Sequence, residues 1–149
     1  MDIYDLRGSR LYLDANVWIY AREDNPRFSR PARAIMKLLA HGELHAVTSE
    51  WTLAEVLIGP IREVDRAAQK AYRAQLQNND RLVVHPVSRE VLLEAARLTA
   101  LHALTLPDAV HAATAKLSNC KYLVSGDEGF RGIAVVPWLP LGSIEIETD

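Results

Sequence analysis

The sequence has one cysteine, no apolar run long enough to span a membrane and no large excess of either charge. A single thiol, Cys120, excludes an internal disulfide and any metal site built from several cysteines. No apolar run approaches the roughly 20 residues of a membrane-spanning helix. The first residues also lack the positive start and apolar stretch of a signal peptide. We therefore expect a cytoplasmic protein with no membrane partner.

Several common phosphate-binding and nucleophile motifs are also missing. Neither G-x-G-x-x-G nor G-x-x-x-x-G-K-[ST] occurs, so the glycines that bind dinucleotides or cradle nucleoside phosphates are absent. No G-x-S-x-G elbow presents a nucleophilic serine. The net charge of -2 neither indicates nor excludes a nucleic-acid partner. With 149 residues, 49% of them hydrophobic, the chain is long enough for one domain over residues 1–149 with its own core.

Apolar strands alternate with helical patterns along the chain. After a short polar lead at 1–9, we predict strands at about 10–14, 44–48, 82–85, 122–124 and 133–136. The helices between them are expected at 15–21, 30–40, 49–58, 61–77, 88–102 and 108–117, with Gly59-Pro60 ending the third. Residues 143–147 alternate like an exposed or edge strand. This order predicts an α/β fold with a parallel sheet covered on both faces.

An acid, Asp14, interrupts the first long apolar run at residues 11–20. Burying a lone ionised carboxylate is far more unfavourable than one hydrogen bond can offset. The acid is therefore expected at a strand end, at an opening or beside a cation. We place it at the carboxyl end of the first strand, where open α/β sheets bind ligands.

Three further carboxylates, Glu55, Asp108 and Asp127, follow strands or open helices in the predicted sheet. Each of the four acids also has an ordinary interpretation: a helix cap for Asp14, a capping box from Thr52 to Glu55, a helix-dipole contact for Asp108 and a turn for Asp127. In a parallel sheet, however, all four would gather at the carboxyl edge. Two like charges about 4 Å apart repel by roughly 4 kcal/mol at an effective dielectric near 20, so such a cluster needs a cation or shared protons.

Oxygen-only ligands select a hard divalent ion, Mg²⁺ or Mn²⁺. Such a site can lower the pKa of a bound water and stabilise both oxygens of an in-line phosphoryl displacement. The residues thus predict metal-assisted hydrolysis of a phosphodiester.

The stretches at 13–17, 48–55, 106–113 and 125–130 resemble the PIN domain, a nuclease family that includes the toxins of the VapBC type. The likeness covers about residues 10–136. It implies a three-layer α/β/α sandwich with a mainly parallel central sheet. It also implies a Mg²⁺-dependent endoribonuclease, the toxin of a type II toxin–antitoxin system, with RNA as substrate, an antitoxin as partner and a toxin homodimer.

The same resemblance assigns roles to individual residues. It implies metal ligation by Asp14, Asp108 and Asp127, and a role for Glu55 through metal-bound water or as a general base. Small polar side chains at Asn16 and Ser125 match positions that support the acids. Two departures stand out: Ala15 replaces a frequent threonine, and Glu128 lies beside Asp127 and is a rival for the fourth acidic position.

The remaining polar residues are less specific. His111 follows Asp108 by one turn, and we interpret it mainly as a packed, hydrogen-bonded histidine near the site. The basic residues form two clusters along the chain. We expect the cluster that follows the first strand to attract phosphates, and we interpret the other as the solvent-exposed face of a helix. The first group is Arg22, Arg27, Arg30, Arg33 and Lys37, and the second is Arg62, Arg66, Lys70 and Arg73.

The sequence leaves two other functions open. One is a catalytically inactive PIN-like module that binds RNA or protein. The other is a phosphohydrolase of small phosphate esters, which would need a covalent nucleophile. An Asp-x-Asp pair would indicate that nucleophile, but residues 14–16 are Asp-Ala-Asn.

Overall fold

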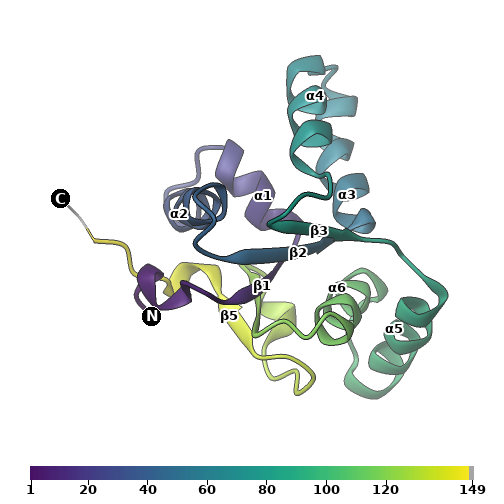
Figure 1. Ribbon diagram of the computed structural model, residues 1–149. Helices are drawn as coiled ribbons and strands as arrows, with labels where there is room; N and C mark the ends of the chain where they lie inside the picture. Colours follow the sequence, from purple (N-terminus) through teal and green to yellow (C-terminus); the bar gives the residue numbers. More distant parts are fainter. Residues whose placement is uncertain (148–149) are drawn as a thin grey trace.

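The computed structural model describes residues 1–147 and contains a five-stranded parallel sheet with helices on both faces (Figure 1). It confirms the α/β class and the α/β/α sandwich. The strands are β1 (Arg10–Leu13), β2 (His45–Ser49), β3 (Leu82–His85), β4 (Tyr122–Ser125) and β5 (Trp138–Pro140). The helices are α1 (Ala15–Arg22), α2 (Ser29–Ala40), α3 (Glu50–Arg62), α4 (Arg66–Gln75), α5 (Arg89–His102) and α6 (Leu106–Leu117). Short 3-10 turns are η1 (Ile3–Leu6), η2 (Glu128–Phe130) and η3 (Leu141–Ser143).

The strand order is β3-β2-β1-β4-β5, and every pair is parallel. From the central β1 the chain adds β2 and β3 on one side, then β4 and β5 on the other. The direction of winding therefore reverses between β1 and β4. In open α/β sheets, ligands bind outside the carboxyl ends of the strands at such a switch point.

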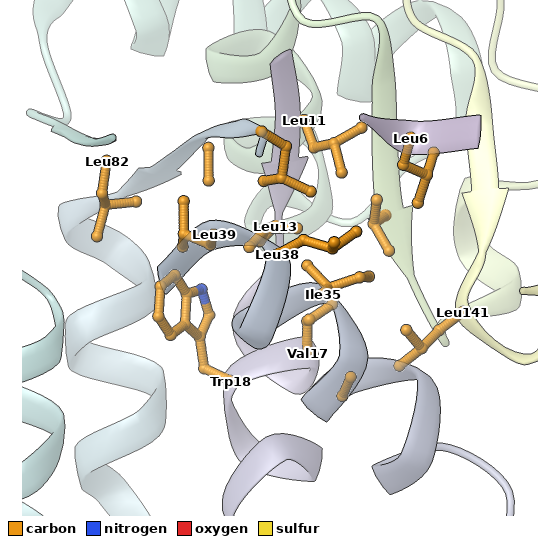
Figure 2. Packing of buried hydrophobic residues seen from close by; sticks show 14 of the residues in the cluster. Leu6, Leu11, Leu13, Val17, Trp18, Ile35, Leu38, Leu39, Leu82 and Leu141 are labelled. Carbon is orange, nitrogen blue, oxygen red and sulfur yellow. The ribbon is translucent and has the colours of Figure 1, made fainter. Parts of the chain in front are cut away.

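The two faces of β1 belong to different apolar clusters because successive strand residues point to opposite sides. Leu11 and Leu13 pack with Val17, Ile35 and other residues on the side of α1 and α2, as Figure 2 shows. On the opposite face, Tyr12 packs in the cluster formed with α5 and α6. This alternation is why a strand of four residues can anchor a layer of helices on each face.

The predicted break at Gly59-Pro60 is wrong, because α3 continues through both residues to Arg62. A proline normally excludes the helical conformation of the preceding residue by contact with its side chain. Gly59 has no side chain, which weakens that restriction. The helix instead ends in a turn at Val64, and α4 begins at Arg66 with Asp65 as its N-cap.

Both predictions near the C-terminus need correction. Residues 133–136 form no strand, although Val136 is buried, and the fifth strand is β5. Pro140 within it and Pro137 directly before it hid this strand from the sequence pattern, but an edge strand tolerates proline because only one side is paired. In the segment predicted as an edge strand, only Glu145 forms a bridge, to Asp2. The supposed polar lead contains η1, which buries Ile3 and Leu6.

The helices are short. Within residues 1–147, none is both long and apolar enough to cross a membrane.

Candidate active site

Asp14 lies directly after β1, at the switch point, and is only 4% exposed. It caps α1 by accepting a hydrogen bond from the backbone N–H of Asn16 at 3.1 Å. The hydroxyl of Ser125, at the end of the adjacent β4, donates to the other carboxylate oxygen. The cap interpretation is therefore correct for Asp14, and it leaves the carboxylate facing the end of β4.

Ser125 and Asn16 connect the two central strand ends. The Ser125 oxygen accepts the backbone N–H of Asp127 at 2.9 Å and the side-chain amide of Asn16 at 3.5 Å. The Asn16 carbonyl oxygen accepts the N–H of Gly126 at 3.2 Å. These bonds place the loop after β4 against Asp14.

Burial raises the pKa of Asp14 to about 7, and the negative charge of Glu55 adds to the increase. His111 and the bonds from Ser125 and Asn16 oppose the increase, but burial dominates. A carboxyl group that changes its charge near neutral pH at an open sheet edge is typical of a functional site.

Asp108 and Asp127 face the same point in space. Asp108 lies in the first turn of α6, whose N-cap is Thr105, and Asp127 caps η2 by accepting the N–H of Gly129 at 2.8 Å. A Cβ atom on Gly129 would lie 2.9 Å from Oδ2 of Asp108 and 3.1 Å from Oδ1 of Asp127. The pKa of Asp108 is raised first by burial and then by the charge of Asp127. Gly129 thus leaves room for two carboxylates to approach each other.

Glu55 reaches the site from the second turn of α3 and bonds to His111. Its Oε1 lies 2.6 Å from Nε2 of His111, and its side chain is 34% exposed. The capping box predicted with Thr52 does not form, because α3 already begins at Glu50 with Ser49 as N-cap. The negative charge of Glu55 raises the pKa of both Asp14 and Asp108, so it belongs to the same electrostatic environment.

Glu128 does not join the other acids. It is exposed and pairs with Arg131 at 2.6 Å. The carboxylate that faces Asp108 is that of Asp127, so the geometry favours Asp127 for the fourth acidic position.

The four acids share a sheet edge but do not form a compact ligand set. Among residues 1–147, no group of three or more His, Cys, Asp or Glu side chains is arranged to hold a metal ion. Glu55 is directed to His111, and Asp14 is held by Ser125. The chemistry of the set nevertheless fits a hard divalent cation. All the ligand atoms would be carboxylate oxygens. The pKa values of Asp14 and Asp108 are raised mainly by burial and further by neighbouring carboxylates, and a cation would offset both effects.

The basic residues predicted to steer phosphates are not equivalent. All five are exposed. Arg33 is occupied by Asp24 at 2.9 Å and by two backbone carbonyls, and Arg22 lies over the ring of Tyr72. Arg27 lies beside Phe28, whose ring contacts the position of a Cβ on Gly126 at 3.5 Å. Arg27 is therefore placed near the loop that carries Asp127.

The second basic stripe, which we expected on one helix, is divided between two. Arg62 ends α3, whereas Arg66, Lys70 and Arg73 lie on α4. All four are exposed, as a solvated surface requires.

Two features of the site were not identified from the sequence. Tyr12 looked like an ordinary strand residue, yet its hydroxyl lies 2.6 Å from Nδ1 of His111. Gly129 carried no signal beyond its place in a turn. The predicted histidine is both packed and part of the site, since His111 is 3% exposed and bonds to Glu55.

A sequence profile of the PIN domain matches residues 11–136. No curated protein sequence matches the chain significantly. Similar solved structures include a toxin–antitoxin complex from Klebsiella pneumoniae, with 23% identity and a TM-score of 0.65 over 85% of this chain and 94% of that one. VapBC2 from Rickettsia felis, bound to a promoter DNA fragment, has 20% identity and a TM-score of 0.67 over 88% and 98%. VapC20 from Mycobacterium tuberculosis, a sarcin-ricin loop cleaving toxin, has 19% identity and a TM-score of 0.65 over 85% and 98%. At these identities the likeness establishes a common fold.

Proposed function

Because this chain belongs to the PIN domain family, we propose that it is a Mg²⁺-dependent endoribonuclease, with Mn²⁺ as a possible substitute. The observation that carries the proposal is that Asp14, Glu55, Asp108 and Asp127 share the carboxyl edge of the sheet, with Asp14 at the switch point. Burial is the main cause of the raised pKa values of Asp14 and Asp108, and the charge of Glu55 adds to both, as that of Asp127 does for Asp108.

In this proposal Asp14, Asp108 and Asp127 hold the cation, and Glu55 is the general base. When bound, a divalent cation supplies an activated water and compensates charge on the scissile phosphate. Ser125 and Asn16 orient Asp14 and the loop that carries Asp127. Arg27 and the neighbouring Arg30 add positive charge that attracts the RNA backbone.

We further propose that the protein is the toxin of a type II toxin–antitoxin system and acts in the cytoplasm. The structures of similar fold include toxin–antitoxin complexes and a toxin that cleaves the sarcin-ricin loop, which supports an antitoxin partner and an RNA substrate. Several large apolar side chains are more than half exposed, which favours a protein partner or a homodimer that covers them. They are Ile58, Ile61, Val64, Leu93 and Leu101.

The direct test is cleavage of RNA in Mg²⁺ buffer by the purified chain and by single variants. We expect Asp14→Asn, Asp108→Asn and Asp127→Asn each to lose at least about a hundredfold in rate, while circular dichroism shows an intact fold. Glu128→Gln is the matched control, because Glu128 is exposed and paired with Arg131. Full cleavage by both Asp14→Asn and Asp108→Asn would overturn the proposal. If Glu128→Gln loses cleavage activity and Asp127→Asn does not, Glu128 rather than Asp127 is the fourth acidic residue of the site.

The spatial separation of the four carboxylates favours a second candidate function. In this alternative the protein is a module of the same fold that binds RNA or protein without cutting it. It is supported by the lack of a compact ligand set within the described part of the chain. Calorimetric titration with Mn²⁺ separates the two functions. A nuclease should bind the ion and lose that binding in Asp14→Asn, whereas a pure binding module should show none.

A further inference from the structure

A buried chain of hydrogen bonds ends on Glu55. It begins at Tyr12 on β1, which is fully buried, and passes through His111 on α6, which is 3% exposed. The tyrosine hydroxyl lies 2.6 Å from Nδ1 of His111, and Nε2 of the same ring lies 2.6 Å from Oε1 of Glu55. Three elements distant in sequence, β1, α6 and α3, thus each contribute one residue to this chain of hydrogen bonds.

The donors and acceptors of this chain define its direction. An ionised carboxylate only accepts hydrogen bonds, so Nε2 of His111 must carry the hydrogen directed at Glu55. In a neutral ring Nδ1 is then an acceptor, and the Tyr12 hydroxyl donates to it. A phenol is neutral near pH 7 and can donate this hydrogen bond. The hydroxyl of Thr48 donates to the carbonyl of Leu13 at 2.7 Å and lies 2.8 Å from the Thr52 hydroxyl, which ties β1 to α3 beside the chain.

We propose that His111, held in one tautomer by Glu55 and Tyr12 together, is a positioning residue that orients the Glu55 carboxylate for the nuclease reaction. This inference rests on the proposed function. Glu55 lies on a helix surface with a side chain that is one-third exposed, so without this bond it would sample several rotamers. The bond from His111 occupies Oε1 and leaves Oε2 free to act on water. Orientation of an active carboxylate by a buried partner is worth about 10–100-fold in activity at comparable sites.

Two amide variants of His111 separate positioning from packing. The side-chain nitrogen of glutamine can replace Nε2 and donate to Glu55, whereas that of asparagine replaces only Nδ1 and cannot reach it. We expect His111→Gln to retain kcat within about threefold and His111→Asn to lose at least about tenfold, with KM unchanged in both. Equal loss in the two variants, or a loss confined to KM, would overturn the proposal.

Tyr12→Phe tests the first link, because it removes the hydroxyl and keeps the aromatic ring. Nitrogen-15 NMR of the His111 ring provides a readout that does not depend on activity. We expect the wild type to show hydrogen on Nε2, and Tyr12→Phe to show a mixture of tautomers together with a several-fold lower kcat. A single tautomer with hydrogen on Nδ1 in the wild type would refute the inference even if RNA is cleaved. Absence of any metal-dependent cleavage in the wild type would instead refute the proposed function, and the NMR result would still decide whether His111 holds Glu55.

Discussion

Asp14 combines a structural contact with an unusually high pKa. It caps α1 and is almost fully buried, yet its pKa is raised to about 7 because burial disfavours its charge. Ionising it therefore opposes folding. In the unfolded chain the same group ionises near 3.8, so between about pH 4 and pH 7 the native state holds a proton that the unfolded state has released.

The first prediction concerns the pH dependence of stability in buffer free of divalent ions. As pH rises from 4 to 7, the wild type should lose stability relative to Asp14→Asn by up to about 1.4 kcal/mol per pH unit. Above pH 7 the difference should level off. Urea unfolding of both proteins from pH 4 to above pH 7 measures this difference in the free energy of unfolding. A difference between the two that stays constant with pH would show that Asp14 ionises normally in the folded protein.

A second prediction at this scale uses Gly129. A Cβ there would lie 2.9 Å from Oδ2 of Asp108, so Gly129→Ala must displace that carboxylate or the turn that carries Asp127. We expect Mn²⁺ affinity and cleavage to fall about tenfold or more, with less than about 1 kcal/mol change in stability because the residue is exposed. Gly132→Ala on the same loop is not a clean control, since its φ is +79°. Gly126→Ala is better, because its nearest neighbour is the Phe28 ring at an ordinary 3.5 Å. Equal metal affinity in Gly129→Ala and the wild type would contradict the prediction.

At the scale of elements, the end of α3 determines where α4 begins. The N–H of Val64 bonds to the carbonyl of Ile61 at 3.2 Å, and the N–H of Asp65 bonds to that of Pro60 at 2.8 Å. This pair of bonds is the Schellman motif, whose left-handed position usually holds glycine. Here Val64 occupies it with φ of 55° and a side chain 68% exposed. A β-branched residue is strained in this conformation.

Val64→Gly should therefore stabilise the protein by about 1 kcal/mol, measured as a higher urea midpoint with an unchanged m-value. Little burial is lost, because the side chain is exposed. Val64→Ala keeps a Cβ and should recover only a small part of that gain. If both variants are less stable than the wild type, Val64 makes a stabilising contact that its exposure does not indicate.

At the scale of the whole molecule, the topology gathers acids from four separate segments. Asp14 and Asp127 follow the adjacent strands β1 and β4, on either side of the point where the winding reverses. Asp108 enters from α6 and Glu55 from α3. Because each is held by a different element, a shared cation would connect much of the fold.

Divalent ions should therefore stabilise the folded protein in a pH-dependent way. At pH 8, where Asp14 is ionised, Mg²⁺ or Mn²⁺ at about 100 times its dissociation constant should add about 2.7 kcal/mol to the free energy of unfolding. At pH 5.5, where Asp14 is protonated, the gain should be much smaller. Thermal melts with NaCl of equal ionic strength control for screening. A gain at pH 8 that persists in Asp14→Asn would place the ion elsewhere.

By itself, the sequence determined the parallel α/β fold, because apolar periodicity marks strands. It also selected the four acids as candidates, because an acid after a buried strand is conspicuous. It could not determine where α3 ends, since the stop at Val64 carries no sequence signal and the apparent stop at Gly59-Pro60 lies within the helix. It also missed β5, whose Pro140 is tolerated because the strand is at an edge of the sheet.

Only the tertiary structure decided which side chains face one another. Asp127 rather than Glu128 approaches Asp108, because Glu128 turns outward to Arg131. Tyr12, His111 and Glu55 are separated by dozens of residues, and no local pattern reports that β1, α6 and α3 bring them into one hydrogen-bonded chain. Contacts of this kind depend on how layers pack and on rotamers within them, and neither is encoded in the spacing of residues along the chain.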